Sequence, residues 1–191
     1  MRTQEIIPLY PMKTASFTIQ KGVLEKIGQG KYNPNHRFPE DIVKDVGLLR
    51  FQQAYKIFFS RNPYNRIVGF YEFSKRMKKS RGQPTRTFEE FVNSPYDTWK
   101  DANGSHVRRQ CDYLYLDGKM IVDYFGRFEF LIADIRKLLL IFEVPNSQTI
   151  EVPHLLLNKH PHYLEYYKNN NFKEKIYEVF KEDFKFFGYS K

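Results

Sequence analysis

Cysteine is nearly absent from this chain of 191 residues, in which Cys111 is the single one, so no disulfide can form within the chain. Long apolar runs are missing too. The longest, 138–142, is far shorter than the roughly 20 residues that a membrane-spanning helix needs. Residues 1–13 lack the apolar centre of a signal peptide. These absences predict a cytoplasmic protein without a transmembrane segment.

The sequence also has no glycine-rich loop of the Walker type, in which a lysine ends a run of glycines ahead of a helix. This argues against a nucleoside-phosphate kinase. Acidic residues are outnumbered: 31 Lys and Arg face 22 Asp and Glu, which gives a net charge of +9. Such a charge favours anionic partners, namely phosphates, sulfated or carboxylated glycans, nucleic acid or a membrane surface, and does not choose among them.

Apolar and aromatic side chains are abundant, at 41% and 17% of residues, and they predict a folded globule of one domain, 1–191. Apolar alternation predicts strands at 5–10 and 54–60 and a hairpin within 112–125. Apolar spacing and end signals predict helices at 17–28, 38–47, 62–77, 87–92, 128–142 and 171–190. The helix at 87–92 is expected to begin with a capping box of Thr87 and Glu90. Because strands and helices alternate, we expect an α/β fold with a mostly parallel sheet flanked by helices.

The first candidate site is the loop "PMKTASFT", residues 11–18, between a strand and a helix. The start of a helix presents unpaired backbone N–H groups and the positive end of the dipole, which suit a phosphate or sulfate. Lys13 adds a positive charge, and the loop also carries hydroxyl side chains. The alternative is an ordinary loop in which Ser16 caps the helix.

The second candidate site is "FFSRNPYNR", where the strand at 54–60 gives way to a helix. Arg61 stands at this junction, and its planar guanidinium matches phosphate oxygens in a bidentate way. Two strand-to-helix loops, each with a cation at the sheet edge, suit a ligand with two separated anionic groups. The alternative is that Arg61 pairs with a neighbouring carboxylate.

The order of "MKTASFTI", "FFSRNPYNRIVGFY", "TFEEFV", "SHVRRQCDYL" and "VDYFGRFEFLIADI" resembles the carbohydrate sulfotransferases, membrane-type enzymes with soluble bacterial relatives. The resemblance runs from Ile6 to Tyr189, and "RNPYNR" is its most specific part. It implies a P-loop-like α/β core. It also implies transfer of a sulfuryl group from 3′-phosphoadenosine 5′-phosphosulfate (PAPS) to a hydroxyl of a carbohydrate acceptor, which can itself be anionic, without a metal.

The resemblance also implies residue roles. Arg61 becomes the main ligand of the 3′-phosphate, and Arg127 a further contact. The loop that grips the 5′-phosphosulfate, with Lys13 near the bridging oxygen, consists of Lys13, Thr14, Ala15, Ser16, Phe17 and Thr18. Two positions depart from the family pattern: Gly69 stands where a serine of the 3′-phosphate site is usual, and Phe17 replaces a hydroxyl residue.

An acceptor hydroxyl needs a general base, and histidine suits this role near neutral pH. His36 matches the family's histidine after the first helix, so we expect it to be the base, with His106 or the carboxylates of Glu40 and Asp41 as alternatives. The remaining histidines are His154, His160 and His162. The last two have no third ligand nearby in the sequence and make a poor zinc site.

Two other functions stay open. The tract 75–86 carries six basic residues and no acid, so a basic binder of polyanions or nucleic acid is one alternative, although nucleic acid is not the expected partner. An inactive relative of the sulfotransferases is the other, because of Gly69 and Phe17.

Overall fold

A computed structural model describes residues 4–29, 36–153, 160–168 and 170–191 of the chain. Its internal contacts divide the chain into two units. The first combines Met1–Ser60 with Gln110–Leu156, and the second combines Arg61–Arg109 with Leu157–Lys191. Within the described ranges, no helix has the length and apolar character that crossing a bilayer requires.

The first unit is built on a parallel sheet of three strands, β1 (Ile6–Leu9), β2 (Tyr55–Ser60) and β5 (Tyr124–Arg127), in the order β1-β2-β5. Both neighbouring pairs are parallel. The carboxyl ends of the three strands therefore meet at one edge, where open α/β sheets bind their ligands. The predicted α/β fold with a mostly parallel sheet is confirmed.

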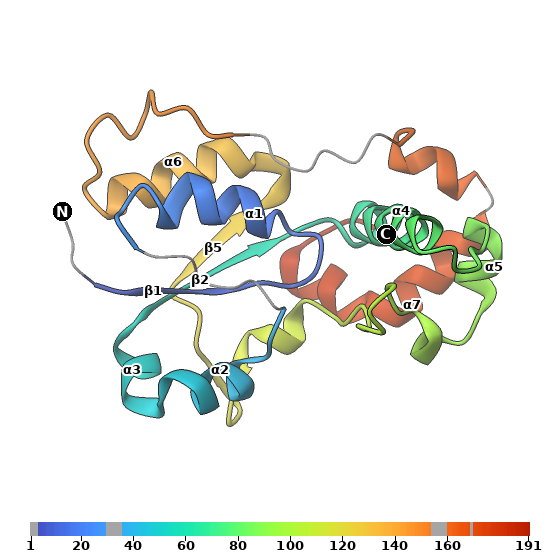
Figure 1. Ribbon diagram of the computed structural model, residues 1–191, viewed down its shortest axis with the longest axis horizontal. Helices are drawn as coiled ribbons and strands as arrows, with labels where there is room; N and C mark the ends of the chain where they lie inside the picture. The colour runs from blue at the N-terminus through green and yellow to red at the C-terminus, as the bar shows by residue number, and fades with distance from the viewer. Residues whose placement is uncertain (1–3, 30–35, 154–159, 169) are drawn as a thin grey trace. The chain divides into compact units, whose positions relative to one another are not determined.

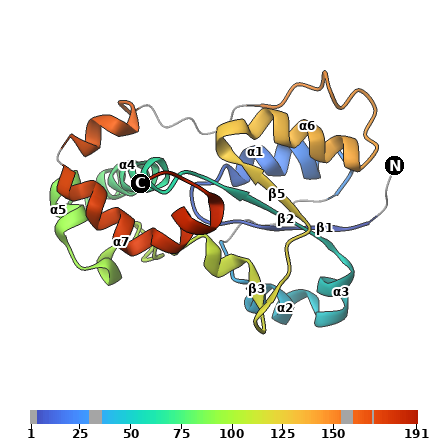
Figure 2. The same ribbon diagram turned by 180° about the vertical axis from the view of Figure 1, so that it is seen from behind.

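Helices cover both faces of this sheet (Figure 1). On one face lie α1 (Ser16–Ile19), its π-helical continuation η1 (Gln20–Leu24) and α6 (Leu131–Ile141). On the other face lie α2 (Pro39–Val46) and α3 (Leu48–Gln53), as the reverse view in Figure 2 also shows. The smaller elements of this unit are η3 (Cys111–Tyr113), β3 (Tyr115–Leu116), β4 (Lys119–Met120) and η4 (Phe128–Phe130).

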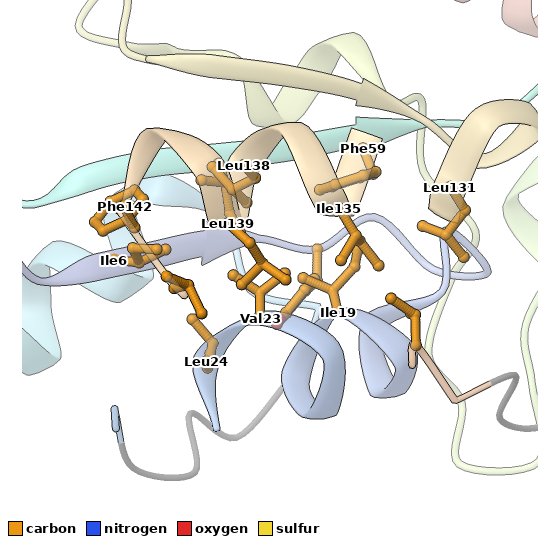
Figure 3. Packing of buried hydrophobic residues seen from close by; sticks show 14 residues of the cluster. Ile6, Ile19, Val23, Leu24, Phe59, Leu131, Ile135, Leu138, Leu139 and Phe142 are labelled. Carbon is orange, nitrogen blue, oxygen red and sulfur yellow. The ribbon is translucent and has the colours of Figure 1, made fainter. Parts of the chain in front are cut away.

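The main core of the first unit lies between the sheet and the α1–α6 layer (Figure 3). Ile19 and Val23 are four residues apart and so share one helical face, which meets Ile135 of α6. Ile57 and Phe59 alternate along β2 toward the same core, and all of these side chains are at most 1% exposed. This packing holds the loop between β1 and α1 at the carboxyl edge of the sheet.

The predicted hairpin within 112–125 is confirmed, but its strands are shorter than this range. The tight hairpin exists, but β4 ends at Met120, and the chain then crosses to pair β5 with β2. Asp123 directs this crossing: its backbone N–H donates to the Lys56 carbonyl, and its carboxylate accepts from the Lys56 N–H at 2.7 Å. Ile121 still donates its N–H to the Leu114 carbonyl across the hairpin, and the bonds to β2 begin at Asp123.

Gly126 in β5 is opposite Phe59 in the register, and a Cβ at this glycine would lie 2.3 Å from Cε1 of the phenylalanine ring. Such a contact is far inside van der Waals distance, so the ring excludes any side chain at Gly126. The glycine of "FGRFE" is therefore explained by packing within the sheet.

The predicted helix 17–28 is only partly α-helical. It continues from α1 into the π-helical turn η1, which ends at Leu24, and residues 25–28 form turns. Gly22 lies in this π-helical segment, where a Cβ would be 3.1 Å from Cγ1 of Val152. A π-helical turn widens the helix, and turns of this kind are often found at functional sites.

The second unit is helical. Its elements are α4 (Pro63–Ser80), α5 (Phe88–Asn93), η2 (Tyr96–Thr98), η5 (Tyr163–Tyr167) and α7 (Asn170–Phe187). The helix α7 packs against both α4 and α5 (Figure 2). Aromatic rings fill the interior of the second unit. Among them are Phe91, Trp99 and Phe180, which are all at most 6% exposed. The predicted capping box at Thr87 and Glu90 is confirmed.

A buried ion pair joins α4 to α7. Arg66 and Asp183 are both 0% exposed, and Nη1 of the arginine lies 3.7 Å from Oδ2 of the aspartate. Nη2 of Arg66 also donates to the carbonyl of Arg108. The second arginine of "RNPYNR" therefore holds the helices of its unit together.

Candidate functional site

The loop between β1 and α1 has an unusual backbone. Lys13 and Ala15 both have a φ of 68°, in the left-handed region that residues other than glycine rarely adopt. Each such residue costs about 1–2 kcal/mol, and strain of this kind concentrates at ligand sites. Alternation between left- and right-handed residues also turns successive N–H groups into one concavity that can bind an anion.

The expectation that Ser16 could cap α1 is wrong. Ala15 is the N-cap residue, no side chain caps the helix, and Ser16 is already the first helical residue. The left-handed Ala15 brings the chain into the helix without the extended geometry that a serine cap requires.

The hydroxyl side chains of the loop point into the protein. Thr14, Ser16 and Thr18 are at most 7% exposed, and Oγ1 of Thr14 donates to the carbonyl of Pro11 at 2.8 Å. Phe17, in contrast, is 51% exposed. Of the predicted donor-binding loop, the surface therefore presents the Phe17 ring, the partly exposed Lys13 and backbone, while the three hydroxyl groups lie beneath it.

His36 is attached to the start of the same loop. Its Nδ1 lies 2.9 Å from the carbonyl of Tyr10, the first residue after β1. Because a carbonyl can only accept, Nδ1 carries the hydrogen and Nε2 is the basic nitrogen of the neutral ring. Tyr113 donates to the carbonyl of His36 at 3.1 Å and stacks on Phe38, which fixes the histidine backbone from the other side.

The other candidate bases have different surroundings. His106 belongs to the second unit, where its Nε2 lies 2.6 Å from the carbonyl of Tyr96. Asp41 accepts from Lys44 in α2, and Glu40 is exposed in the first turn of that helix.

The remaining three histidines give no support for a base. Nδ1 of His160 contacts the carbonyl of Pro161, and the ring of His162 makes a tilted contact with that of Tyr163. His154 lies outside the described residues. Among the described histidines, His36 is therefore the one that the structure links to the loop of Lys13.

Arg61 begins the second unit, directly after the last residue of β2. Its Nη2 donates to Oδ1 of Asn65 at 2.8 Å, one helical turn further along α4. A Cβ at Gly69 would lie 3.2 Å from Nη1 of Arg61 and 3.6 Å from its Cζ. The guanidinium thus lies against the backbone of α4, in space that any residue larger than glycine would narrow.

The helix that follows Arg61, α4, has a well-formed start. Oδ1 of Asn62 accepts from the N–H groups of Tyr64 and Asn65, at 3.0 and 3.3 Å, and Pro63 is the first helical residue. An asparagine cap followed by proline is a typical helix start, which explains why sequence patterns predicted α4 well.

Arg127 is the last residue of β5 and pairs in register with Ser60, the last residue of β2. Its side chain is exposed, while its backbone N–H donates to Oδ2 of Asp134 at 2.8 Å. The position of Arg127 at the carboxyl edge of the sheet agrees with a role in ligand contact.

Two buried tyrosines remain neutral at physiological pH. Burial raises the pKa of Tyr64 to about 12, and the Glu174 carboxylate acts in the same direction. Burial, followed by the Asp134 carboxylate, also raises the pKa of Tyr124, whose hydroxyl donates to the carbonyl of Asp134 at 2.7 Å. Neither tyrosine therefore supplies a phenolate that could act as a base at that pH, and the hydroxyl of Tyr124 has a structural role through its hydrogen bond.

Sequence reasoning missed three residues that shape this region: Asn65, Arg66 and Gly126. Asn65 and Arg66 lie within the "RNPYNR" motif, but their partners are only visible in three dimensions. Gly126 had a usable signal, because a glycine within a strand often marks a close approach of another group.

Most of the chain is similar in sequence to one known protein family. Residues 13–190 match the model of the sulfotransferase family. No curated protein matches the chain. The family match includes the loop of Lys13, the junction at Arg61 and both units. The chain therefore belongs to the sulfotransferase family.

Proposed function

We propose that this protein transfers a sulfuryl group from PAPS to a hydroxyl group of a carbohydrate acceptor, and that 1–191 acts as one sulfotransferase domain. The observation that carries this proposal is the strained loop at Lys13 and Ala15, at the carboxyl edge of a parallel sheet and directly ahead of a helix. In a chain of the sulfotransferase family, such a backbone fits the 5′-phosphosulfate group of a donor.

Arg61 is proposed to bind the 3′-phosphate. Its Nη2 is oriented by Asn65, and the bare backbone at Gly69 leaves room for the guanidinium. An oriented guanidinium loses less freedom when it forms two parallel bonds to a phosphate, which suits it to recognition of that group. The hydroxyl that a serine at position 69 would provide is absent, so we assign the recognition of the 3′-phosphate to Arg61.

The chain's own residues support in-line displacement. PAPS supplies a sulfuryl group on a good leaving group, the 5′-phosphate. The acceptor oxygen forms the new S–O bond while the bond to the 5′-phosphate oxygen breaks. Nε2 of His36 takes the hydroxyl proton, and Lys13 stabilises the negative charge on the departing oxygen. Positioning and electrostatic stabilisation provide most of the rate increase in this kind of transfer.

Titration calorimetry tests the donor assignment. The probes are 3′-phosphoadenosine 5′-phosphate (PAP), AMP and ATP, titrated into the protein and into Arg61→Ala. We expect the protein to prefer PAP over AMP by about 100-fold, since a truncated charge pair typically costs 2–5 kcal/mol, and we expect Arg61→Ala to lose this preference.

Arg76→Ala is the matched control, because Arg76 is an exposed arginine on α4, the helix that follows Arg61. An equal loss in both variants would show a general effect of charge and would contradict the assignment of Arg61. Absence of binding to all three nucleotides would overturn the donor proposal and leave a polyanion binder or an inactive relative.

A further inference from the structure

A pocket in the second unit gathers positive charge without being part of the donor assignment. We call it the basic pocket. It is lined by Tyr71, Ser74, Lys75, Lys78, Thr85, Arg86, Phe91, Thr98 and Lys100. The residues come from three segments: the second half of α4, the stretch from Thr85 into α5, and the stretch that ends at Lys100. The sequence had indicated the tract 75–86, which includes Lys75, Lys78 and Arg86, as a basic surface, but not Lys100.

Hydrogen bonds hold the three segments together around the pocket. The hydroxyl of Tyr71 donates to the carbonyl of Arg86 at 2.9 Å. Oγ of Ser74 donates to the carbonyl of Lys100 at 3.3 Å, and Nη1 of Arg86 donates to Oγ1 of Thr98 at 3.3 Å. The backbones that carry the basic side chains are therefore fixed relative to one another, and the pocket is a defined feature of the fold.

The positive charges of the pocket are not neutralised by carboxylates of the described residues. None of the ion pairs between described residues includes Lys75, Lys78, Arg86 or Lys100. Four like charges in one pocket repel one another, so a bound anion would lower the electrostatic energy.

The acidic groups close to the pocket have other partners. Glu90 accepts from both the backbone and the hydroxyl of Thr87, and these bonds, with a smaller contribution from Arg86, lower the pKa of its carboxyl group. Glu72 accepts from the hydroxyl of Tyr166 at 2.9 Å. Neither carboxylate lines the pocket.

The chemistry of the lining indicates what kind of anion fits. Ammonium and guanidinium groups stand beside the hydroxyls of Ser74, Thr85 and Thr98, a mixture of donors suited to the several oxygens of a tetrahedral oxyanion. The two aromatic rings, Tyr71 and Phe91, are buried, so they offer no open platform on which a nucleic-acid base could stack. A single small charged group suits the pocket better than a polynucleotide.

We propose that the basic pocket is a second anion-binding site, which takes one sulfate or phosphate monoester group. That a saccharide carries this group rests on the proposed function. The site is separate in its residues from Lys13, Arg61 and the other proposed donor contacts. Its occupant would be a group that the saccharide already bears before any transfer takes place.

The test measures both where and how tightly such esters bind. N-acetylglucosamine 6-sulfate and N-acetylglucosamine 6-phosphate are titrated into ¹⁵N-labelled protein, alongside inorganic sulfate and uncharged N-acetylglucosamine, and amide shifts are followed by NMR. We expect saturable shifts at Ser74, Lys75, Thr98 and Lys100 with the esters and none with the uncharged sugar. Comparison of the two esters identifies which oxyanion is preferred.

Two variants with the same loss of charge separate the pocket from general electrostatics. Lys78→Gln combined with Lys100→Gln should weaken ester binding by about tenfold or more, because each lysine provides a charge-assisted contact. Lys181→Gln combined with Lys185→Gln, two exposed residues of α7 outside the pocket, should change it less than about twofold. Equal losses in the two variants, or shifts confined to other residues, would overturn the proposal.

Inorganic sulfate that binds as tightly as the esters would overturn the assignment to a saccharide. Stronger binding of a single-stranded oligonucleotide than of the esters, lost in the pocket variant, would replace it with a nucleic-acid site. PAP titrated into the same variants keeps this result distinct from the donor proposal: the pocket variant should bind PAP like the parent. Failure of PAP to bind the parent would remove the donor proposal and leave the pocket result intact.

Discussion

The two strand-to-helix junctions of this protein differ in how they are built. After β1, the backbone is strained at Lys13 and Ala15, and no side chain caps the helix. After β2, Asn62 caps the helix, and Asn65 holds the side chain of Arg61. The first junction thus shapes the backbone, and the second positions a side chain. In the proposed function, the first junction contacts the charge that appears during the reaction, and the second contacts the fixed charge of the 3′-phosphate.

The largest expected effect concerns His36, which is bonded to the first junction. Replacement by alanine removes the proposed base and should lower kcat by about 10²–10⁴. Because a base must be deprotonated, the rate of the parent should fall toward acidic pH, and this limb should disappear in the variant. A pH–rate profile that keeps its shape in His36→Ala would move the role to His106 or to a carboxylate.

The second largest effect is expected for Lys13→Ala, because this variant removes the positively charged side chain from the first junction. If the lysine acts on the leaving group, kcat should fall by about 10²–10³ while the affinity for PAP changes less than about tenfold. Steady-state kinetics and calorimetry on the same preparation measure both values. A variant with nearly normal turnover but poor PAP binding would assign Lys13 to ground-state binding.

Gly69→Ala tests the second junction. A Cβ there would press on the Arg61 guanidinium, which must then move by a few tenths of an ångström. We expect the affinity for PAP to fall by about tenfold, equivalent to about 1.4 kcal/mol, with kcat less affected. Gly69→Ser should displace the Arg61 guanidinium in the same way and also adds a hydroxyl group. Unchanged PAP binding in both variants would show that the position of Arg61 against α4 is unimportant for recognition.

The smallest expected effects are two changes of opposite sign in the free energy of unfolding, one at each junction. Asn62→Ala removes the cap of α4 and should lower the free energy of unfolding by about 1 kcal/mol. Ala15→Gly relieves the left-handed backbone strain but makes the unfolded chain more flexible. The net result should be a rise in the free energy of unfolding by about 0.5 kcal/mol. Urea denaturation of the two variants gives both values. Two changes of the same sign would show that the junctions do not differ in the way described.

The same contrast explains what the sequence could predict. The start of α4 and the capping box at Thr87 depend on local residue types, so both were predicted correctly. The strain in the first loop was not predictable, because neither Lys13 nor Ala15 is a residue type associated with positive φ. The pairing of β5 with β2 depends on the distant contact between Asp123 and Lys56, while local alternation favoured a hairpin.

The site was predictable in the same uneven way. Lys13, His36 and Arg127 were chosen from the sequence, and the structure has all three in the unit that contains the parallel sheet. Which side chains orient them was not predictable, because Tyr10 is 26 residues away from His36 in the chain. The proposed roles of Lys13–Thr18, Arg61, Gly69 and Arg127 in donor binding remain predictions.

The ion pair between Arg66 and Asp183 has a consequence for the order of events during synthesis. The arginine leaves the ribosome long before the aspartate that neutralises it, because the second unit is made of two separate stretches of chain. Until the later stretch emerges, α4 has no buried carboxylate to accompany Arg66, and an unaccompanied charge is strongly disfavoured in a folded interior. The sheet-containing unit, whose last stretch ends at Leu156, can thus mature first, and the helical unit is left to assemble after translation of α7.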